Sequence, residues 1–362
     1  MLSTVVGQAR AINPDGRIGV VCVSPDVSPI VHILGIIPEP VWNGDGYDDY
    51  LRVLDRYDTV VMIGADVMDG VYGEHNAVRF WAMSDLAARK GLRSFVLGCS
   101  FSDAIAPQVK AAVRRLSPLL TVNARDRLSK EKFDAVSSLS AELVADSAFL
   151  LPPTPTAPDQ DNVAAWVKSQ HDAGRFVCAF NTHPMIFEEN PLPQVAALND
   201  RLAVIIPRLV EKHAVSFLLV PHDFRGPEQG DIVSLEPLYK LLEPQLADRL
   251  HIARSAARAS ELKALVACAD MLVTGRMHLG VGALSMGVPI WGLSPQDKFA
   301  GLFEHFGQGD MRITPTMATD PALLESFLDE ALSNWVSARD QVRSALPRVK
   351  QLSSRNFGIL TA

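Results

Sequence analysis

Residues 269–307 read ADMLVTGRMHLGVGALSMGVPIWGLSPQDKFAGLFEHFG, and this stretch predicts the fold more clearly than any other part of the chain. An apolar run ends at Gly275 and continues through Arg276 and His278 into a helix of small residues, after which a short strand is expected at 289–292. Strands of a parallel sheet joined by helices give this alternation. The stretch therefore indicates a βαβ unit of an open sheet.

The same alternation runs through the rest of the chain, where short β-branched runs are separated by longer amphipathic stretches. This pattern is typical of consecutive parallel βαβ units. Further strands are expected at 18–23, 31–36, 59–63, 94–97, 119–123, 175–180, 216–221, 250–253 and 271–274, and helices at 76–90, 104–116, 195–213, 278–286 and 321–344.

A proline-rich stretch marks the boundary between two domains. The 362 residues are about twice the length of a common single domain, and LLPPTPTAPDQDN at 150–162 can continue neither a helix nor a central strand. We therefore expect a first domain at 1–150, a linker at 151–165 and a second domain at 166–362. The predicted fold class is α/β, with two doubly wound, Rossmann-like domains facing a cleft in a GT-B-like arrangement, where ligands lie beyond the carboxyl ends of the strands.

The composition excludes several classes of function. A formal net charge of -7, without a run of Lys or Arg, gives no electrostatic reason to expect nucleic-acid or anionic-membrane binding. The sequence shows neither a secretion signal at its start nor an apolar run of about 18 residues, so a cytoplasmic protein without a membrane span is predicted. The cysteines lie far apart without CxxC spacing, which argues against a zinc site and favours free thiols; they are Cys22, Cys99, Cys178 and Cys268.

Arg276 and His278 are the strongest candidates for a functional site. They stand between a strand and a helix, where backbone amides and the helix dipole favour an anion. A guanidinium there offers two parallel hydrogen bonds to a carboxylate or phosphate, and an imidazole holds or releases a proton near neutral pH. The alternative is that both residues are only helix caps or surface residues.

Other polar residues are expected to follow strands at the ligand-binding edges of the two sheets. Asn181 and His183 come after the first strand of the second half and His222 after the next one, whereas Asp66 follows a strand of the first half. Lys298 lies in the loop after the last strand. Polar turns, and a solvated surface lysine at 298, are the alternatives.

The chain resembles the polysaccharide pyruvyl transferases. TGRMH at 274–278, the small-residue helix after it and GVPIWGLSPQDKFAGLFEHFG at 287–307 are similar to the C-terminal signature of that family. RSFVLGCS at 93–100, LTVNARDRLSKEKF at 120–133 and ADSAFLL at 145–151 resemble further family segments in the same order. The chain departs from the family in three places. Gly64-Ala65-Asp66 replaces a Gly-Gly-Gly turn, and Asn181-Thr182-His183 stands where many members have an Arg. The family's Asn-x-Gly-Asp-like start after the first strand is not evident, unless Asn43-Gly44-Asp45 is a displaced version of it.

The resemblance implies an enzyme that moves the enolpyruvyl group of phosphoenolpyruvate onto two hydroxyls of a glycan sugar as a ketal, in polysaccharide biosynthesis. Arg276 would neutralise the donor's carboxylate and phosphate, and His278 would protonate its methylene carbon. Met277, Lys298 and Arg125 would join the substrate-binding residues, although Arg125 and Asp126 also suit a purely structural pair. No metal or cofactor is needed beyond the donor.

The expected partners are phosphoenolpyruvate and a sugar or lipid-linked glycan, the latter placing the enzyme at the inner membrane face without a span of its own. The acceptor, the ketal stereochemistry and the oligomeric state, a homo-oligomer included, stay open.

Two other functions stay open as well. A GT-B glycosyltransferase that uses a nucleotide sugar often carries a carboxylate on the helix after the penultimate strand, and LGVGALSMG has none. A non-catalytic, sugar-binding member of the family is compatible with the altered Gly64-Ala65-Asp66 turn. A Rossmann dehydrogenase is excluded because no GxGxxG follows an expected strand.

Overall fold

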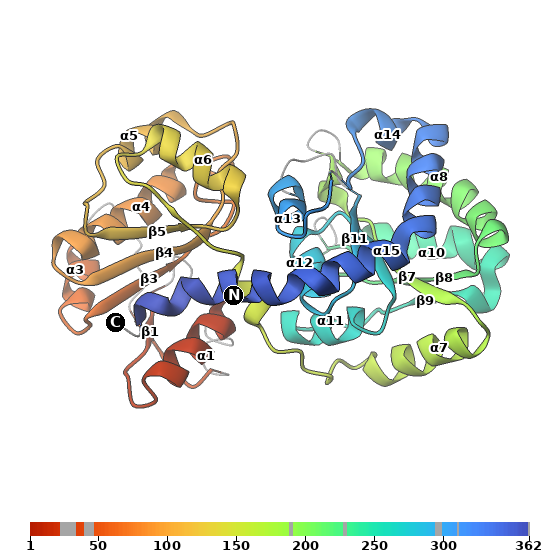
Figure 1. Ribbon diagram of the computed structural model, residues 1–362, viewed down its shortest axis with the longest axis horizontal. Helices are drawn as coiled ribbons and strands as arrows, with labels where there is room; N and C mark the ends of the chain where they lie inside the picture. The colour runs from red at the N-terminus through yellow and green to blue at the C-terminus, as the bar shows by residue number, and fades with distance from the viewer. Residues whose placement is uncertain are drawn as a thin grey trace. The chain divides into compact units, whose positions relative to one another are not determined.

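The computed structural model describes residues 1–21, 34–39, 47–187, 191–226, 230–293, 299–309 and 311–360. The chain divides into two compact units, one of Met1–Leu151 with Lys350–Ala362 and one of Pro152–Val349. Each unit has a parallel sheet with helices packed on both faces (Figure 1). The predicted α/β class with two Rossmann-like domains is therefore confirmed.

The first unit has a four-stranded parallel sheet in the order β3-β4-β5-β6, and a separate parallel pair, β1-β2. Its strands and helices are α1 (Leu2–Ile12), β1 (Gly19–Val20), β2 (Ile37–Pro38), α3 (Asp48–Leu54), β3 (Thr59–Ile63), α4 (Glu74–Arg89), β4 (Arg93–Cys99), α5 (Pro107–Val113), β5 (Leu120–Ala124), α6 (Arg127–Val136) and β6 (Glu142–Leu143).

Strand β4 shows why this sheet is covered on both faces. Its residues from 94 to 99 are all buried, which matches the near-continuous apolar run of a central parallel strand. Phe95 and Leu97 pack with Val5 of α1 and Phe357 near the C-terminus. Val96 points to the opposite face, into a cluster that includes side chains of α4, α5 and α6.

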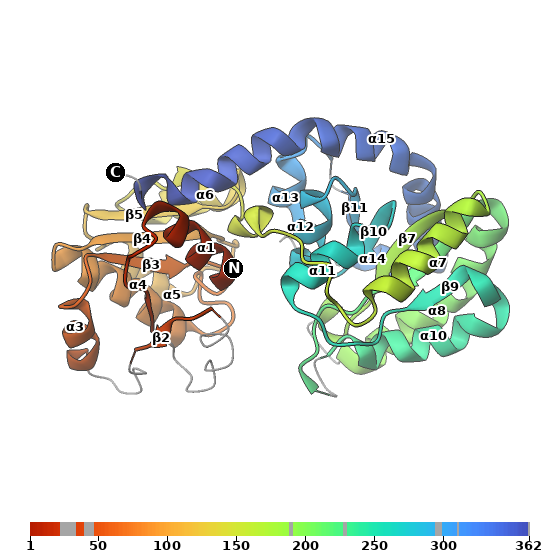
Figure 2. The ribbon, with the colours of Figure 1, turned by 90° about the horizontal axis from the view of Figure 1, so that it is seen from below.

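The second unit has a five-stranded parallel sheet in the order β11-β10-β7-β8-β9, and the strands β11, β10 and β7 can be followed in Figure 2. Because β10 returns to the side of β7 away from β8, the strand order reverses between β7 and β10. Its elements are α7 (Gln160–Asp172), β7 (Phe176–Asn181), α8 (Pro191–Lys212), β8 (Val215–Leu219), α10 (Ile232–Leu246), β9 (Leu250–Ile252), α11 (Ala259–Val266), β10 (Met271–Thr274), α12 (Met277–Ser285), β11 (Ile290–Gly292), α13 (Ala300–Glu304), α14 (Pro315–Thr319) and α15 (Pro321–Ser354).

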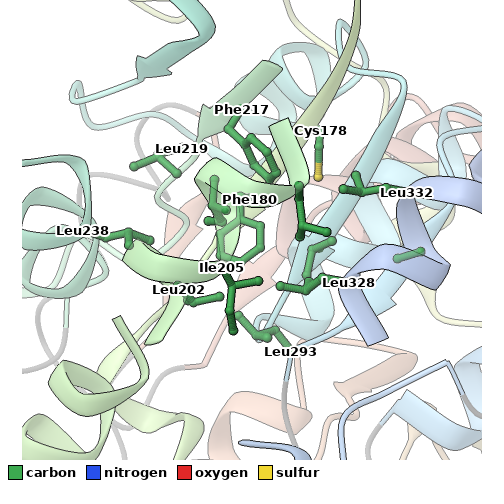
Figure 3. Close-up of a cluster of buried hydrophobic side chains, with 14 of the residues drawn as sticks. Cys178, Phe180, Leu202, Ile205, Phe217, Leu219, Leu238, Leu293, Leu328 and Leu332 are labelled. Atoms are coloured by element: carbon green, nitrogen blue, oxygen red, sulfur yellow. The ribbon is translucent and has the colours of Figure 1, made fainter. Parts of the chain in front are cut away.

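The core of this unit lies between the sheet and the helices α8, α10 and α15. Phe180 and Phe217 of neighbouring strands meet with their rings tilted at 70°, and leucines of the three helices surround them (Figure 3). The labelled side chains in that view are Cys178, Phe180, Leu202, Ile205, Phe217, Leu219, Leu238, Leu293, Leu328 and Leu332. Helices α7 and α12 pack on the opposite face of the sheet, against β7 and β10.

Several elements lie where the sequence predicts them. Strands β3 and β10 have the predicted bounds, and most of the other central strands start or end within a few residues of them. Half of the strand predicted at 31–36 lies outside the described residues, and residues 34–36 are not in a strand, since β2 starts at Ile37. Helices α1, α6, α7, α10 and α11 were not predicted from the sequence.

The domain boundaries differ from the prediction in two respects. The first unit ends at Leu151, but the expected linker is attached to the second unit, where the amide of Thr154 donates to the carbonyl of Ser260 at 3.0 Å and α7 begins at Gln160. Residues from 350 onward belong to the first unit, because Asn356 Nδ2 donates to the carbonyl of Ala145 at 2.8 Å. Among the described residues, none of the helices is long and apolar enough to cross a membrane.

Candidate active site

The residues predicted to bind a ligand gather where the strand order of the second unit reverses. Strands β7 and β10 are neighbours, and Thr274 pairs in register with Asn181 at their carboxyl ends. In open α/β sheets, ligands bind at such a switch point, beyond the carboxyl ends of the strands. Arg276 stands at the N-terminal end of α12, whose first turn has no side-chain cap, and its amide donates to Thr274 Oγ1 at 2.9 Å.

Glycine at 275 allows the turn to pass directly over His183. A Cβ atom at this position would lie 2.5 Å from His183 Nε2 and 3.0 Å from Ile186 Cγ1, both well inside contact distance. His183 is 1% exposed, so it is enclosed beneath the turn. Gly280 has a similar role against the sheet, because a Cβ there would lie 2.8 Å from Ile290 Cδ1. Glycine at 280 thus lets α12 approach the sheet closely.

The guanidinium of Arg276 is held by two carboxylates. Its Nε and Nη2 donate to Asp231 Oδ1 at 2.9 and 2.5 Å, and Nη2 lies 3.3 Å from Asp223 Oδ2. Nη1 is on the other side of the group, 3.9 Å from the sulfur of Met185, a residue that is 41% exposed. The side chain of Arg276 is 13% exposed and that of Asp231 is fully buried. One edge of the guanidinium is therefore fixed inside the protein.

Asp231 also binds the ends of β7 and β8. Its Oδ2 accepts hydrogen bonds from Asn181 Nδ2 at 2.9 Å and from the amides of His222 and Asp223 at 2.8 and 3.2 Å. Asn181 is itself fully buried, and its Nδ2 donates to the carbonyl of Val220 at 2.9 Å. Asn181 therefore supports the site through Asp231 and the neighbouring strands.

His222 is neutral over the physiological range. Its own burial, together with the nearby charges of His278 and Arg276, lowers its pKa to about 3, because each of them disfavours the imidazolium. The carboxylate of Asp223 opposes this shift without cancelling it. His222 therefore accepts hydrogen bonds or donates one from its neutral ring, and it cannot supply a proton as an acid at neutral pH.

Asp223 is ionised at neutral pH. Burial alone would raise its pKa, but hydrogen bonds from Arg225 and the charge of Arg276 lower it to about 2. Arg225 Nη2 donates to Asp223 Oδ2 at 2.7 Å. A carboxylate with such a low pKa is a poor base. Its role is thus electrostatic.

The structure brings together five of the predicted residues at this switch point: Asn181, His183, His222, Arg276 and His278. Met277 begins α12 with a side chain that is 5% exposed, so a ligand would meet its backbone amide more readily than its side chain. Lys298 lies outside the described residues. Arg125 and Asp66 belong to the first unit.

Arg125 is enclosed in the first unit. Its side chain is 5% exposed, donates to Ser100 Oγ at 2.9 Å and lies 3.8 and 3.9 Å from carboxylate oxygens of Asp126 and Asp146. Asp126 caps α6 by accepting from the amide of Ser129 at 2.7 Å. These contacts favour the structural alternative for the Arg125–Asp126 pair.

Asp66 follows β3 and is partly exposed. The turn before it depends on Gly64, where a Cβ would lie 2.0 Å from the carbonyl oxygen of Leu97. The first glycine of the altered Gly64-Ala65-Asp66 turn is therefore required by the close approach of β3 and β4.

Asp231 was not predicted from the sequence. It precedes the apolar helix α10, so the sequence signals only a helix cap, yet its side chain makes no capping bond. Its contacts join segments 45 and 50 residues apart, which no local pattern shows. Within the described ranges, no cluster of three or more His, Cys, Asp or Glu side chains is arranged to hold a metal ion.

Comparison with known proteins gives the family and the fold of the chain. The sequence profile of the family described as "Polysaccharide pyruvyl transferase" matches residues 5–297. The chain belongs to this family. No curated protein matches the sequence. The chain is thus a member of a transferase family.

Solved structures share the fold at low sequence identity. Anabaena Alr3699/HepE, in complex with UDP and glucose, has a TM-score of 0.58 at 14% identity, covering 99% of this chain and 93% of that one. A putative UDP-N-acetylglucosamine 2-epimerase from Listeria monocytogenes has a TM-score of 0.60 at 12% identity, with coverages of 98% and 90%. UDP-GlcNAc 2-epimerase from Neisseria meningitidis, bound to UDP-GlcNAc, has 0.58 at 10%, with 98% and 96%.

Proposed function

We propose that this chain transfers the pyruvyl group of phosphoenolpyruvate to two hydroxyls of a glycan sugar, forming a ketal. The observation that carries the proposal is the pairing of Arg276 and His278 at the uncapped start of α12, at the switch point of the sheet, in a polysaccharide pyruvyl transferase. An arginine and a histidine at such a helix start suit a small anion that must also receive a proton.

Arg276 is proposed to bind the donor's charged groups. Asp231 accepts from its Nε and Nη2 and so fixes the guanidinium, whose positive charge would attract a carboxylate or phosphate oxygen. The amides at the start of α12 would add further donors from the same direction. Charge-assisted bonds of this kind both hold phosphoenolpyruvate and stabilise the departing phosphate.

His278 is proposed to be the general acid. His222 is neutral, because its pKa lies near 3, and His183 is enclosed beneath Gly275 at 1% exposure. We therefore assign the proton transfer to the methylene carbon to His278, the remaining predicted histidine at this site.

The proposed reaction balances without an oxidant or reductant. The methylene carbon takes a proton, the first sugar hydroxyl forms a bond to the central carbon and loses its proton, and the C–O bond to phosphate breaks with its electron pair going to phosphate. The second hydroxyl then closes the ring on the same carbon and loses its proton. Of the two hydroxyl protons, one in effect replaces that given to the methyl group and the other ends on hydrogen phosphate.

The first test is calorimetric titration of the protein with phosphoenolpyruvate, together with Arg276→Ala and a control, Arg208→Ala. Arg208 lies on the surface of α8, where it pairs with Glu325. We expect Arg276→Ala to weaken binding by at least about tenfold, since a charge-assisted contact is lost, and Arg208→Ala to bind like the unchanged protein. Equal binding by both variants would contradict the role of Arg276.

The second test is phosphate release in the presence of a panel of glycan acceptors. His278→Ala should lower kcat by about 10²- to 10⁴-fold, the usual contribution of a general acid, while the fold is kept. The control, His171→Ala, removes a histidine that is hydrogen-bonded to Asp270, at the amino-terminal ends of the strands and away from the site. Full turnover by His278→Ala would remove this residue as the acid.

A glycosyltransferase that uses a nucleotide sugar is the second candidate, because several proteins of this fold were solved with UDP or UDP-GlcNAc. UDP and GDP titrated in parallel separate the two proposals. Binding of a nucleotide but not of phosphoenolpyruvate would favour the glycosyltransferase. Binding of none of the three ligands would favour a non-catalytic, sugar-binding member. The glycan acceptor, free or lipid-linked at the inner membrane face, stays a prediction that the acceptor panel addresses.

A further inference from the structure

Asp231 has an unusual position for a residue that precedes a helix. An aspartate at a helix N-terminus ordinarily accepts hydrogen bonds from the first amides of that helix. Asp231 stands at this position before α10, but its side chain makes no capping bond. It points instead to the ends of β7, β8 and β10, and it is fully buried. Its carboxylate therefore serves the switch point of the sheet.

The carboxylate is fully used. Oδ1 accepts from Nε and Nη2 of Arg276, and Oδ2 accepts from Asn181 Nδ2 and from the amides of His222 and Asp223. A buried carboxylate is stable only when it is paired and hydrogen-bonded. Arg276 supplies the opposite charge, and the other three donors fix the plane of the carboxylate. Two contacts from one oxygen then fix the orientation of the guanidinium.

We propose that Asp231 is the positioning residue of the anion site, holding the guanidinium of Arg276 in the orientation that meets the donor. This inference rests on the function proposed above. Asp231 does not touch the donor itself, because it is enclosed behind Arg276. Asp223 differs from it: its carboxylate is partly accessible, lies 3.3 Å from Arg276 Nη2 and is held by Arg225. An arriving anion would be repelled by Asp223 but not by the paired and buried Asp231.

The two carboxylates should therefore affect anion binding in opposite directions. In titrations of the full chain with phosphoenolpyruvate and with inorganic phosphate, we expect Asp231→Asn to weaken binding by about tenfold or more, as supporting residues of a site commonly do. Asp223→Asn should strengthen it by about three- to tenfold at low salt, since a like charge is removed. Unchanged binding by Asp231→Asn, or an equal loss in both variants, would overturn the proposal.

Asp270→Asn is the matched control. Asp270 also joins β10 to β7, by accepting from the amide of Val177 at 2.8 Å, but it does so at the amino ends of the strands. Loss of an aspartate that only stabilises the sheet should lower the unfolding temperature without changing donor affinity. If Asp270→Asn weakens binding as much as Asp231→Asn does, the effect is one of stability and the positioning role is refuted.

A double variant separates positioning from general support. If Asp231 acts through Arg276, Asp231→Asn combined with Arg276→Ala should bind no more weakly than Arg276→Ala alone. Additive losses would contradict the proposal.

A further measurement needs no Asp231 variant. NMR can follow the exchange of the Arg276 Nε proton with water in the unchanged protein, and Arg276→Lys assigns the signal. We expect exchange about tenfold slower than at an exposed arginine, because the proton is bonded to a buried carboxylate. Fast exchange would overturn the proposal even if Asp231→Asn fails to fold. Failure of the unchanged protein to bind phosphoenolpyruvate would instead count against the proposed function. The exchange rate would still show whether Arg276 is paired with Asp231.

Discussion

Gly275 offers a direct test of how the strand-turn-helix motif is built. Replacement by alanine would put a Cβ atom 2.5 Å from His183 Nε2, 2.7 Å from its Cδ2 and 3.0 Å from Ile186 Cγ1. His183 is enclosed, so its ring cannot simply swing into solvent. Overpacking of this kind typically destabilises a protein by about 1–3 kcal/mol. For a domain of this size, that lowers the unfolding temperature by about 2–12 °C.

Gly282→Ala is the control within the same helix. A Cβ there would lie 3.9 Å from Lys263 Cα, an ordinary contact, so alanine should stabilise α12 by about 0.5–1 kcal/mol through its lower unfolded-state entropy. Differential scanning calorimetry measures both variants and separates transitions of the two units. The double variant Gly275→Ala with His183→Ala should recover part of the loss, since the clashing ring is gone. If Gly275→Ala is as stable as Gly282→Ala, the reasoning is refuted.

Three further perturbations test other parts of the structure. In the folded protein His222 has a pKa of about 3 and is neutral, whereas in the unfolded chain it takes up a proton below about pH 6.5. The free energy of unfolding should therefore fall as the pH drops between these values, by up to about 1.4 kcal/mol per pH unit. Urea unfolding at pH 7, 6 and 5 should show a weaker pH dependence for His222→Gln than for the unchanged protein. Asp126→Ala removes the cap that accepts from Ser129 and should cost about 1 kcal/mol in thermal unfolding, which an unchanged transition would contradict. Gly64→Ala would put a Cβ 2.0 Å from the carbonyl oxygen of Leu97; because a backbone atom cannot move aside, we expect a loss of about 3 kcal/mol or more, and normal yield and stability would disprove this contact.

The part of the fold that sequence reasoning finds is the part set by local pattern. Strand β10 and the start of α12 are predicted within a residue because a continuous apolar run, a glycine and a small-residue helix stand next to each other in the chain. Such runs are typical of parallel strands buried on both faces. The ligand-binding edge follows from the same pattern, since Arg276 and His278 come directly after the strand.

The sequence does not reveal which residues far apart in the chain contact each other in the fold. The periodicity of α15 predicts a helix from Pro321. Nothing local indicates that this helix ends in the first unit, where Ser353 donates to the carbonyl of Asp146. Asp231 is the same case within the site. Its importance comes from three strand ends that meet in space, and an acidic residue before a helix has a simpler local interpretation as a cap.

The balance of charge at the switch point has a consequence for the proposed reaction. Arg225 and Arg276 carry two positive charges, and Asp223 and Asp231, which pair with them, carry two negative ones. Among these four side chains the charges cancel, so they bind an anion through directed hydrogen bonds and add little to a long-range field. In the proposed reaction, the charge that varies is that of His278. His278 gives a proton to the methylene carbon and regains one from a sugar hydroxyl, so its positive charge is absent only between these two steps.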